Sequence, residues 1–390
     1  MEAQRVEAAQ LRIGEPIPFD VYDAKGRLLT RKGATLSSEE QLDRLVEQGL
    51  FFVEEERTRL VRDAALRARV QVPSYADRKV SVVRLLDDAR ETLGALSESP
   101  DPDGFEAAVL ALADNVGAAC RLDADAAVGS IVASRDAAYP ERHQVNCAVL
   151  ACLVLGALGE PAEAVREGVA AALTMNLAMI DIQRVLYRQK EALDDGQNAQ
   201  VRSHPLRGEH RLRELGVTRA RWLATVAQHH ELVDGSGYPE ALRGDAICIG
   251  ARVLAVADQY CALVSERAYR EGINPVLVAG KFRTAPGGAF DPRVVAALLA
   301  QLGPYPPGAL VHLAGGQIGV VCARTRSPQS PIVMACVSPQ GVRYPAPRKK
   351  ATSDSTSAID RPMPQGSLVP FPDAAELWAD AYDVPARPPA

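Results

Sequence analysis

The sequence has few of the features that mark several common protein classes. Its seven cysteines are an odd number with no C-x-x-C pair, so neither a disulfide framework nor a zinc knuckle is indicated. The net charge of −5 gives no general attraction to nucleic acid or anionic membranes. The longest uncharged apolar run, Cys147–Gly159, is shorter than the roughly 20 residues of a membrane-spanning helix, and the N-terminus lacks a secretory pattern. We therefore expect a cytoplasmic protein with no nucleic-acid partner and no membrane span.

Periodicity divides the 390 residues into five parts and predicts a mainly α fold. Residues 1–70 alternate apolar positions and then take a helical period, which indicates a small α+β module. Residues 71–124 are typical of connecting helices, and the Ala- and Leu-rich residues 125–301 predict a helical bundle. Residues 302–346 become β-branched and predict a short β module. From 347 to 390 the composition turns to Pro, Ser, Thr and Ala, so we expect a disordered tail.

Histidine is scarce, with six in the chain, and this makes its placement informative. His229 and His230 end a helical segment and are followed by the turn sequence DGSGYP. His204 lies 25 residues before this pair, Asp258 lies 28 residues after it in an apolar helix, and His143 begins another apolar helix. Because ligands from several helices converge in the metal sites of helical bundles, these five residues are candidate metal ligands.

Each candidate also has an ordinary structural explanation. Two histidines at a helix end can be an exposed polar pair, and a histidine in an apolar helix is often a hydrogen-bonded core residue. Asp258 can form a salt bridge to Arg252 or Arg267. The residues alone leave both interpretations open.

The stretch from His229 to Arg270 resembles the C-terminal signature of the HD-GYP family, bacterial metal-dependent phosphodiesterases that hydrolyse cyclic di-GMP. It contains the paired histidines, Gly237-Tyr238-Pro239, Asp258 and a closing RAYR similar to the family's R-P-Y-R. Upstream, His204-Pro205 with Gly208 fits the family pattern, and His143 stands where the family has its first ligand. The resemblance extends over roughly 125–300 and implies an HD-superfamily helical bundle.

The resemblance also implies roles for particular residues. His143, His204, His229, His230 and Asp258 match family metal ligands. Arg267 and Arg270 stand where family members contact phosphate, although surface ion pairs with Glu266 or Glu271 explain them equally well. The loop Gly237-Tyr238-Pro239 is similar to the family loop linked to GGDEF-type signalling partners.

The sequence departs from the family at the residue pair that names it. Met175 and Asn176 replace the adjacent His and Asp, and in the family this aspartate bridges two metal ions. Asn176 offers a neutral oxygen and Met175 a soft thioether, so a two-metal centre is not expected. Asp181 lies on a different helical face and does not replace the lost carboxylate. Tyr139 stands where the family has a further acidic residue, which argues against a third metal.

We therefore expect either one divalent metal, Fe or Mn, at a degraded site or none. The predicted function is cyclic di-GMP-related signalling through binding of a cyclic nucleotide or a protein, with catalysis absent or weak. One alternative is an active metal-dependent cyclic di-GMP phosphodiesterase with a noncanonical site. Another is a structural scaffold whose tail, around Trp378 and Tyr382, engages a partner groove.

Overall fold

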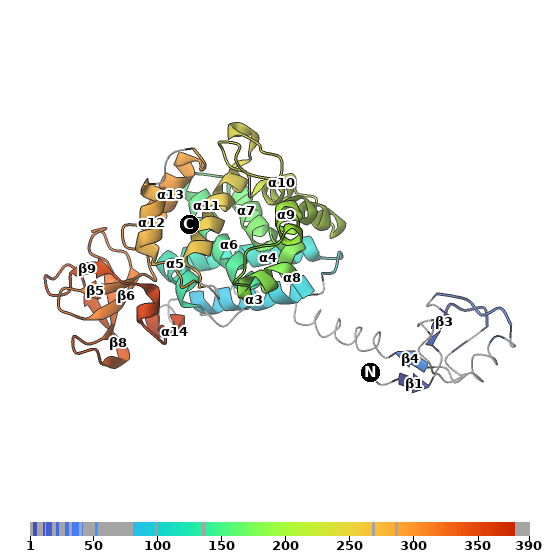
Figure 1. Cartoon of the computed structure of the whole chain (residues 1–390), viewed down its shortest axis with the longest axis horizontal. Helices are drawn as coiled ribbons and strands as arrows, with labels where there is room; N and C mark the ends of the chain where they lie inside the picture. The colour runs from blue at the N-terminus through green and yellow to red at the C-terminus, as the bar shows by residue number, and fades with distance from the viewer. Residues whose placement is uncertain are drawn as a thin grey trace. The chain divides into compact units, whose positions relative to one another are not determined.

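The chain forms two compact units, Met1–Gln71 and Val72–Ala390, which are described separately. Figure 1 shows both in a computed structural model. The structure describes residues 3–5, 11, 13–17, 21–22, 28–30, 33–38, 41, 51–53, 81–98, 100–134, 138–266, 270–284 and 288–378.

The first unit contains a small antiparallel sheet with strand order β1-β4-β2-β3. The helix expected in this unit falls almost wholly on residues outside the described part. The strands are β1 (Ala3–Arg5), β2 (Val21–Tyr22), β3 (Leu28–Thr30) and β4 (Phe51–Val53).

The second unit is a helical bundle built around α6 (Tyr139–Ala157), which is apolar on nearly every face and packs against helices on all sides. The helices α3 and α4, expected to be connectors, pack on α6 and belong to the bundle. The other helices are α3 (Val82–Glu98), α4 (Phe105–Leu122), α5 (Ala124–Ala133), α7 (Ala162–Thr174), α8 (Ile180–Arg188), α9 (Asp195–Glu214), α10 (Ala220–Gln228), α11 (Ile249–Val264), α12 (Pro275–Thr284) and α13 (Pro292–Leu302), with short 3₁₀ turns η2 (Leu177–Met179) and η3 (Gly244–Ala246).

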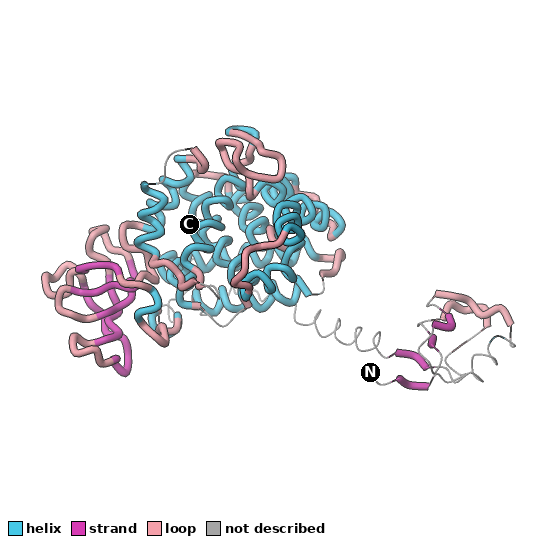
Figure 2. The backbone as a smooth tube through the Cα atoms, in the orientation of Figure 1, coloured by secondary structure: helices cyan, strands magenta, loops and turns pink. Residues whose placement is uncertain are grey.

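A five-stranded antiparallel sheet follows the bundle, with strand order β8-β7-β6-β5-β9. Figure 2 shows these strands in magenta beside the helices of the same unit. Three of the five residues of its core cluster are β-branched valines, as the β-branched composition predicts; the cluster is Ala309, Val311, Leu313, Val321 and Val333. The strands are β5 (Leu310–Leu313), β6 (Ile318–Ala323), β7 (Ile332–Val337), β8 (Arg343–Ala351) and β9 (Ile359–Pro362). The mainly α fold with a small β module after the bundle is confirmed.

The expectation of a disordered tail from residue 347 is wrong as far as residue 378. Strand β8 runs through Ala351, β9 pairs with β5, and a short helix α14 (Ala374–Leu377) ends beside Trp378. Trp378 is only 5% exposed, and its Nε1 donates to the Cys322 carbonyl at 2.9 Å. The composition misled because an edge strand needs few apolar residues and one tryptophan buries a large area.

The scaffold alternative named two aromatic residues, Trp378 and Tyr382, as partner contacts, and the first of them is buried. A Cβ on Gly129 would lie 2.0 Å from the tryptophan ring, so the ring fills a notch in α5 that only glycine leaves open. Trp378 is therefore not available to a partner groove. Tyr382 lies outside the described residues.

One segment of the described chain, Ala162–Arg188, is long and apolar enough to cross a membrane by length and composition. It consists of α7, η2 and α8, and 56% of its apolar window is buried inside the protein. A core helix of a folded domain passes the same test, so this segment is weak evidence for a membrane span.

Candidate metal centre and ligand cavity

His204 is oriented by the proline that follows it. Pro205 lies inside α9 and has no N–H, so it cannot donate to the Val201 carbonyl as a residue four positions later normally would. The fully buried His204 takes that place, and its Nδ1 donates to the Val201 carbonyl at 2.6 Å. The lone pair of His204 therefore lies on Nε2, on the opposite side of the ring.

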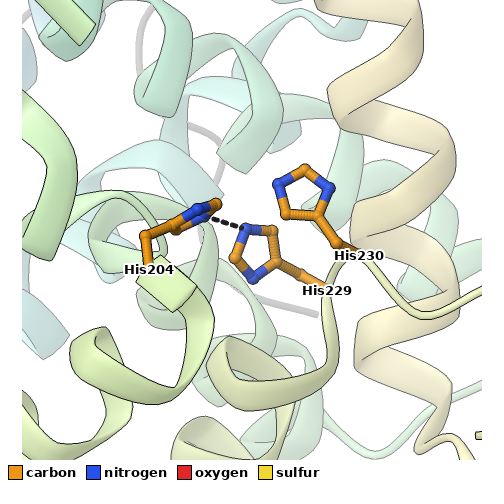
Figure 3. A group of neighbouring side chains, drawn as sticks. All are labelled: His204, His229 and His230. Carbon is orange, nitrogen blue, oxygen red and sulfur yellow. Dashed lines mark hydrogen bonds between the residues drawn. The ribbon is translucent and has the colours of Figure 1, made fainter. Parts of the chain in front are cut away.

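His229 is oriented in the same way by the end of a helix. Helix α10 ends at Gln228, which leaves its last carbonyls without helical partners. The Nδ1 of His229 donates to the Val226 carbonyl at 2.7 Å, and its Nε2 lies 3.0 Å from the Nε2 of His204 (Figure 3). The ring of His230 completes the group, with its centroid 5.0 Å from that of His204 and 4.2 Å from that of His229.

The three imidazoles fit a cation. Burial, reinforced by the positive charge that a neighbouring imidazole would carry, lowers the pKa of each of His204, His229 and His230 to about 3. The rings are therefore neutral near pH 7, and no proton lies between the facing Nε2 atoms of His204 and His229. A metal ion that accepts both lone pairs resolves this contact, and the Nδ1 hydrogen bonds to carbonyls are those that metal-ligating histidines make.

A second group lies where α6 meets α11. The Nε2 of His143 lies 2.7 Å from an Asp258 carboxylate oxygen and 3.7 Å from the Sγ of Cys147. The donor atoms of these three residues all lie within 4.8 Å of one another. His143 and Cys147 are four residues apart and share a face of α6. The structure therefore offers two groups of metal-ligating side chains.

Asp258 has a different partner from those that the sequence suggested. Burial raises the pKa of its carboxyl group, but the hydrogen bond from His143 and the nearby imidazoles outweigh burial and lower the pKa below its usual range. Arg252 pairs instead with Asp291 at 3.0 Å and Asp245 at 2.9 Å. The other sequence candidate, Arg267, lies outside the described residues.

The loop after the paired histidines packs on the metal-ligating group. The Tyr238 ring stacks on His230 with centroids 4.7 Å apart and planes at 22°. A Cβ on Gly237 would lie 2.5 Å from the His230 carbonyl oxygen, so only glycine allows this approach. The buried Glu231 carboxylate accepts hydrogen bonds from the backbone N–H groups of Glu240 and Leu242 at 2.6 and 3.0 Å. The loop therefore fixes the position of His230.

A cavity of about 560 Å³ opens over these residues, within the usual size of a small-molecule site. Asn176 lies on its wall, whereas Met175 is fully buried in the core and Asp181 is exposed outside the cavity. The cavity is lined by Tyr139, His143, Asn176, Met179, Gln183, Leu186, Tyr187, Gln189, Lys190, Glu191, Ala192, Leu193, Val201, His204, His230, Tyr238, Asp258 and Ala262.

The structure thus brings all five sequence-derived ligand candidates to one place. His143, His204, His230 and Asp258 line the cavity, and His229 lies against His204 and His230. Arg270 instead donates to the Ala262 carbonyl at 2.8 Å, at the end of α11.

Sequence reasoning missed Cys147 as a candidate ligand. The signal that could have found it is its spacing of four residues from His143 on a helix. Tyr139, one turn before His143, stacks on that ring with centroids 5.4 Å apart and on Tyr187 at 4.5 Å. An aromatic wall therefore stands where the sequence lacks a further acidic ligand.

Comparison with known proteins finds similar sequences over the helical bundle. A family model described as "HD domain" matches residues 127–294. The "Cyclic di-GMP phosphodiesterase PA4108" of Pseudomonas aeruginosa is 31% identical over 241 residues, which cover 62% of this chain and 56% of that protein. The "Cyclic di-GMP phosphodiesterase response regulator RpfG" of Xanthomonas campestris is 47% identical over 72 residues, which cover 18% of this chain and 19% of that protein.

Two further similar proteins have lower sequence identity to this chain. The "Cyclic di-GMP phosphodiesterase PdeB" of Borreliella burgdorferi is 24% identical over 46% of this chain and 47% of that protein. A solved structure of Bd1817, an "HDG"Y"P protein" of Bdellovibrio bacteriovorus, is 16% identical with a TM-score of 0.47, covering 76% of this chain and 98% of that one. The matched part of this chain spans about half or less of the length of the PA4108, RpfG and PdeB proteins.

Proposed function

Because this chain belongs to the HD-GYP family, we propose that it is a cyclic di-GMP signalling protein that binds a cyclic dinucleotide in the cavity and turns it over little or not at all. The names of its relatives support the ligand, since several are cyclic di-GMP phosphodiesterases. Action in the cytoplasm is part of the proposal, and the free thiol state of all seven cysteines supports it.

The observation that carries the proposal is Asn176 on the cavity wall. Its amide is neutral, so it does not supply the negative charge that would hold two divalent cations on one bridging oxygen. Met175 contributes nothing in its place, because its side chain is fully buried away from the cavity. The three histidines nevertheless remain in an arrangement that fits one cation, so the site keeps metal binding and loses the bridged pair.

The walls of the cavity suit a nucleotide. Tyr187 offers an aromatic face on which a base can stack, and Lys190 is a lining cation for a phosphate. Arg270 is not among the cavity-lining residues, and its guanidinium donates to the Ala262 carbonyl. Arg267 lies outside the described residues, so both arginines stay in the proposal as phosphate contacts on the family resemblance alone. A cavity of this kind binds a cyclic dinucleotide without needing to cleave it.

The loop Gly237-Tyr238-Pro239 is part of the same proposal as a contact for a GGDEF-type signalling partner. Its central tyrosine touches His230, so occupancy of the site and the conformation of the loop are physically linked. This linkage supports a protein that reports binding to a partner.

The test is calorimetric titration of the full chain with cyclic di-GMP, together with chromatography of the nucleotide after incubation with Fe²⁺ or Mn²⁺. We expect binding without linear or cleaved product. Lys190→Ala should weaken binding about tenfold, corresponding to about 1.4 kcal/mol. Lys281→Ala, at the end of α12 and not among the cavity-lining residues, is the matched control and should bind normally.

Asn176→Asp is the complementary variant, because it restores the missing charge with almost no change of shape. It should raise hydrolysis at least tenfold over the wild type. Substantial hydrolysis by the wild type that disappears in His229→Ala and Asp258→Ala would instead establish the active phosphodiesterase alternative. Absence of any nucleotide binding would leave only a role in protein contacts.

A further inference from the structure

We propose that Cys147 supplies the negative charge that the chain lacks at Asn176, and that His143, Cys147 and Asp258 bind a thiophilic divalent cation such as Zn²⁺. The inference adds a second, separate ion to the site of the proposed function, and its test needs no nucleotide. It also goes beyond the sequence-based expectation of at most one metal, which considered no thiol ligand.

The geometry of the group suits a tetrahedral ion. With Zn–S near 2.3 Å and Zn–N near 2.0–2.1 Å, the sulfur and nitrogen ligands of a tetrahedral zinc lie about 3.6 Å apart. The Sγ of Cys147 lies 3.7 Å from the Nε2 of His143. The Asp258 oxygen, at 2.7 Å from the same Nε2, must move away by about 0.7 Å, and its side chain is 23% exposed to the cavity and has room to do so.

The charge of the group explains why no bridging carboxylate is required. A thiolate and a carboxylate together carry two negative charges, which neutralise one divalent cation at this site. The His204, His229 and His230 group is neutral, so an ion bound there keeps its full charge. Two ions then occupy neighbouring sites without a shared anion, because one site has no net charge to repel the other.

The proton balance of binding is simple. The Cys147 thiol releases its proton to solvent, and the His143 proton moves from Nε2, where it faces Asp258, to Nδ1. The Nδ1 of His143 has no hydrogen-bond partner among the described residues, unlike the Nδ1 of His204. The proton that moves there is a buried N–H without an acceptor, and metal binding must outweigh this cost. No electron is transferred in this step.

The residues around the group fix the three ligands and leave the fourth coordination position of the metal ion open. Cys147 and His143 are 0% and 2% exposed on α6. Burial, followed by the neighbouring Cys261 and Asp258, raises the pKa of the free Cys147 thiol, so Cys147 becomes a thiolate only when it binds the metal. His143 and Asp258 line the cavity, so the fourth position of a tetrahedral ion faces the space available to water or a nucleotide phosphate oxygen. Thiolate ligation favours Zn²⁺ over Mn²⁺ at this position.

The experiment uses the full chain, stripped with a chelator and reloaded with Zn²⁺ or with Co²⁺ as a spectroscopic probe. We expect two zinc ions per chain by mass spectrometry and a thiolate-to-Co²⁺ charge-transfer band in the near ultraviolet. Cys147→Ser should bind one zinc ion, lose the band, and weaken the second site by more than 100-fold, since loss of an outer-shell partner alone costs about 10–100-fold.

Cys152→Ser is the matched control, because Cys152 lies on the same helix but outside this group of ligands. It should keep both ions and the band. His229→Ala should lose the other ion and keep the band, which separates this inference from metal binding at the histidine group. Circular dichroism of each variant establishes that it is folded.

X-ray absorption of the zinc-loaded wild type makes the result independent of any variant, and we expect about one sulfur ligand for every two zinc ions. A band that persists in Cys147→Ser, zinc without sulfur ligation, or a Cys147–Cys261 disulfide in the loaded protein would each overturn the proposal.

Discussion

At the scale of single residues, the candidate site depends on backbone carbonyls that lack their usual helical donors. Pro205 leaves the Val201 carbonyl free, and the end of α10 leaves the Val226 carbonyl free. Each carbonyl accepts from the Nδ1 of a histidine and so directs its Nε2 toward the other. In both cases a carbonyl left free by a local irregularity of the helix orients the histidine ring as a metal ligand.

This relation makes Pro205→Ala informative, because its two expected effects have opposite signs. Alanine restores an N–H that competes for the Val201 carbonyl and removes the cost of an interior proline. The free energy of unfolding should rise, by up to about 3 kcal/mol. Affinity for Co²⁺ at the histidine group should fall about 10–100-fold. Urea unfolding and Co²⁺ titration measure the two effects.

Pro292→Ala is the control for this pair of effects, because Pro292 stands in the first turn of α13, where the missing N–H frees no carbonyl. It should leave Co²⁺ affinity unchanged. Equal Co²⁺ affinity in Pro205→Ala and the wild type would show that the proline does not orient His204.

Asp291 gives a pH-dependent prediction at the same scale. Burial raises its pKa, but hydrogen bonds from Arg293 and Arg252 prevail and lower it to about 2. Because the folded-state pKa lies below the unfolded value, the stabilisation is present above about pH 4 and is lost as pH falls toward 2. Asp291→Asn should therefore cost at most about 2 kcal/mol at pH 6 and about half as much at pH 3.

Urea unfolding of the Asp291→Asn variant and the wild type at both pH values measures this difference. Comparing the two proteins cancels the titration of all other groups. A cost that is the same at pH 6 and pH 3 would mean that the carboxylate charge does not stabilise the folded protein.

At the scale of elements, the loop after α10 joins the histidine group to the surface. Gly237 lets the chain pass close to the His230 carbonyl, and Tyr238 stacks on the His230 ring. The Glu231 carboxylate binds the backbone N–H groups of the segment that follows the turn. The loop and the site therefore form one unit, in which a shift of the loop moves a ligand.

Gly237→Ala tests this connection. The added Cβ would lie 2.4 Å from the Leu232 backbone nitrogen, so the loop must shift and carry Tyr238 away from His230. We expect at least tenfold weaker Co²⁺ binding at the histidine group with the helical circular dichroism retained. Gly280→Ala, on α12 with no atom within 4 Å of the new Cβ, should bind Co²⁺ like the wild type. Unchanged binding in Gly237→Ala would separate the loop from the site.

At the scale of the whole second unit, the β module is tied to the bundle by contacts far apart in the sequence. The Arg324 backbone N–H donates to the Asp125 carboxylate at 2.8 Å, and Trp378 packs against Gly129. Both contacts join the part of the chain that follows the bundle to α5. The α5 surface is thus shared between the bundle and the β module.

Trp378 variants test whether this docking stabilises the protein. Trp378→Ala should lower the free energy of unfolding by about 3–5 kcal/mol, since a large buried ring is removed. Trp378→Phe keeps an aromatic ring and loses the hydrogen bond to Cys322, so it should cost about 1–2 kcal/mol. Urea denaturation measures both. Two variants as stable as the wild type would mean that the segment around residue 378 is not docked.

The sequence by itself determined the helical bundle, the β module after it, and the residues that match the ligands of a known family. These features follow from local periodicity and from chemically distinctive residues such as the paired histidines. Both can be recognised within a single segment of the sequence. The change at Met175 and Asn176 was also visible there, because a lost charge needs no coordinates to be recognised.

Only the tertiary structure decided which side chains face one another. Composition alone did not reveal that β8, β9 and Trp378 are ordered, because their partners lie on β7, β5 and α5. Nor did it show that Cys147 meets His143 and Asp258 while Arg252 turns to Asp291, since helix packing, and not sequence spacing, sets contacts between α6 and α11. Local interactions form the elements, and burial of their shared surfaces selects the partners.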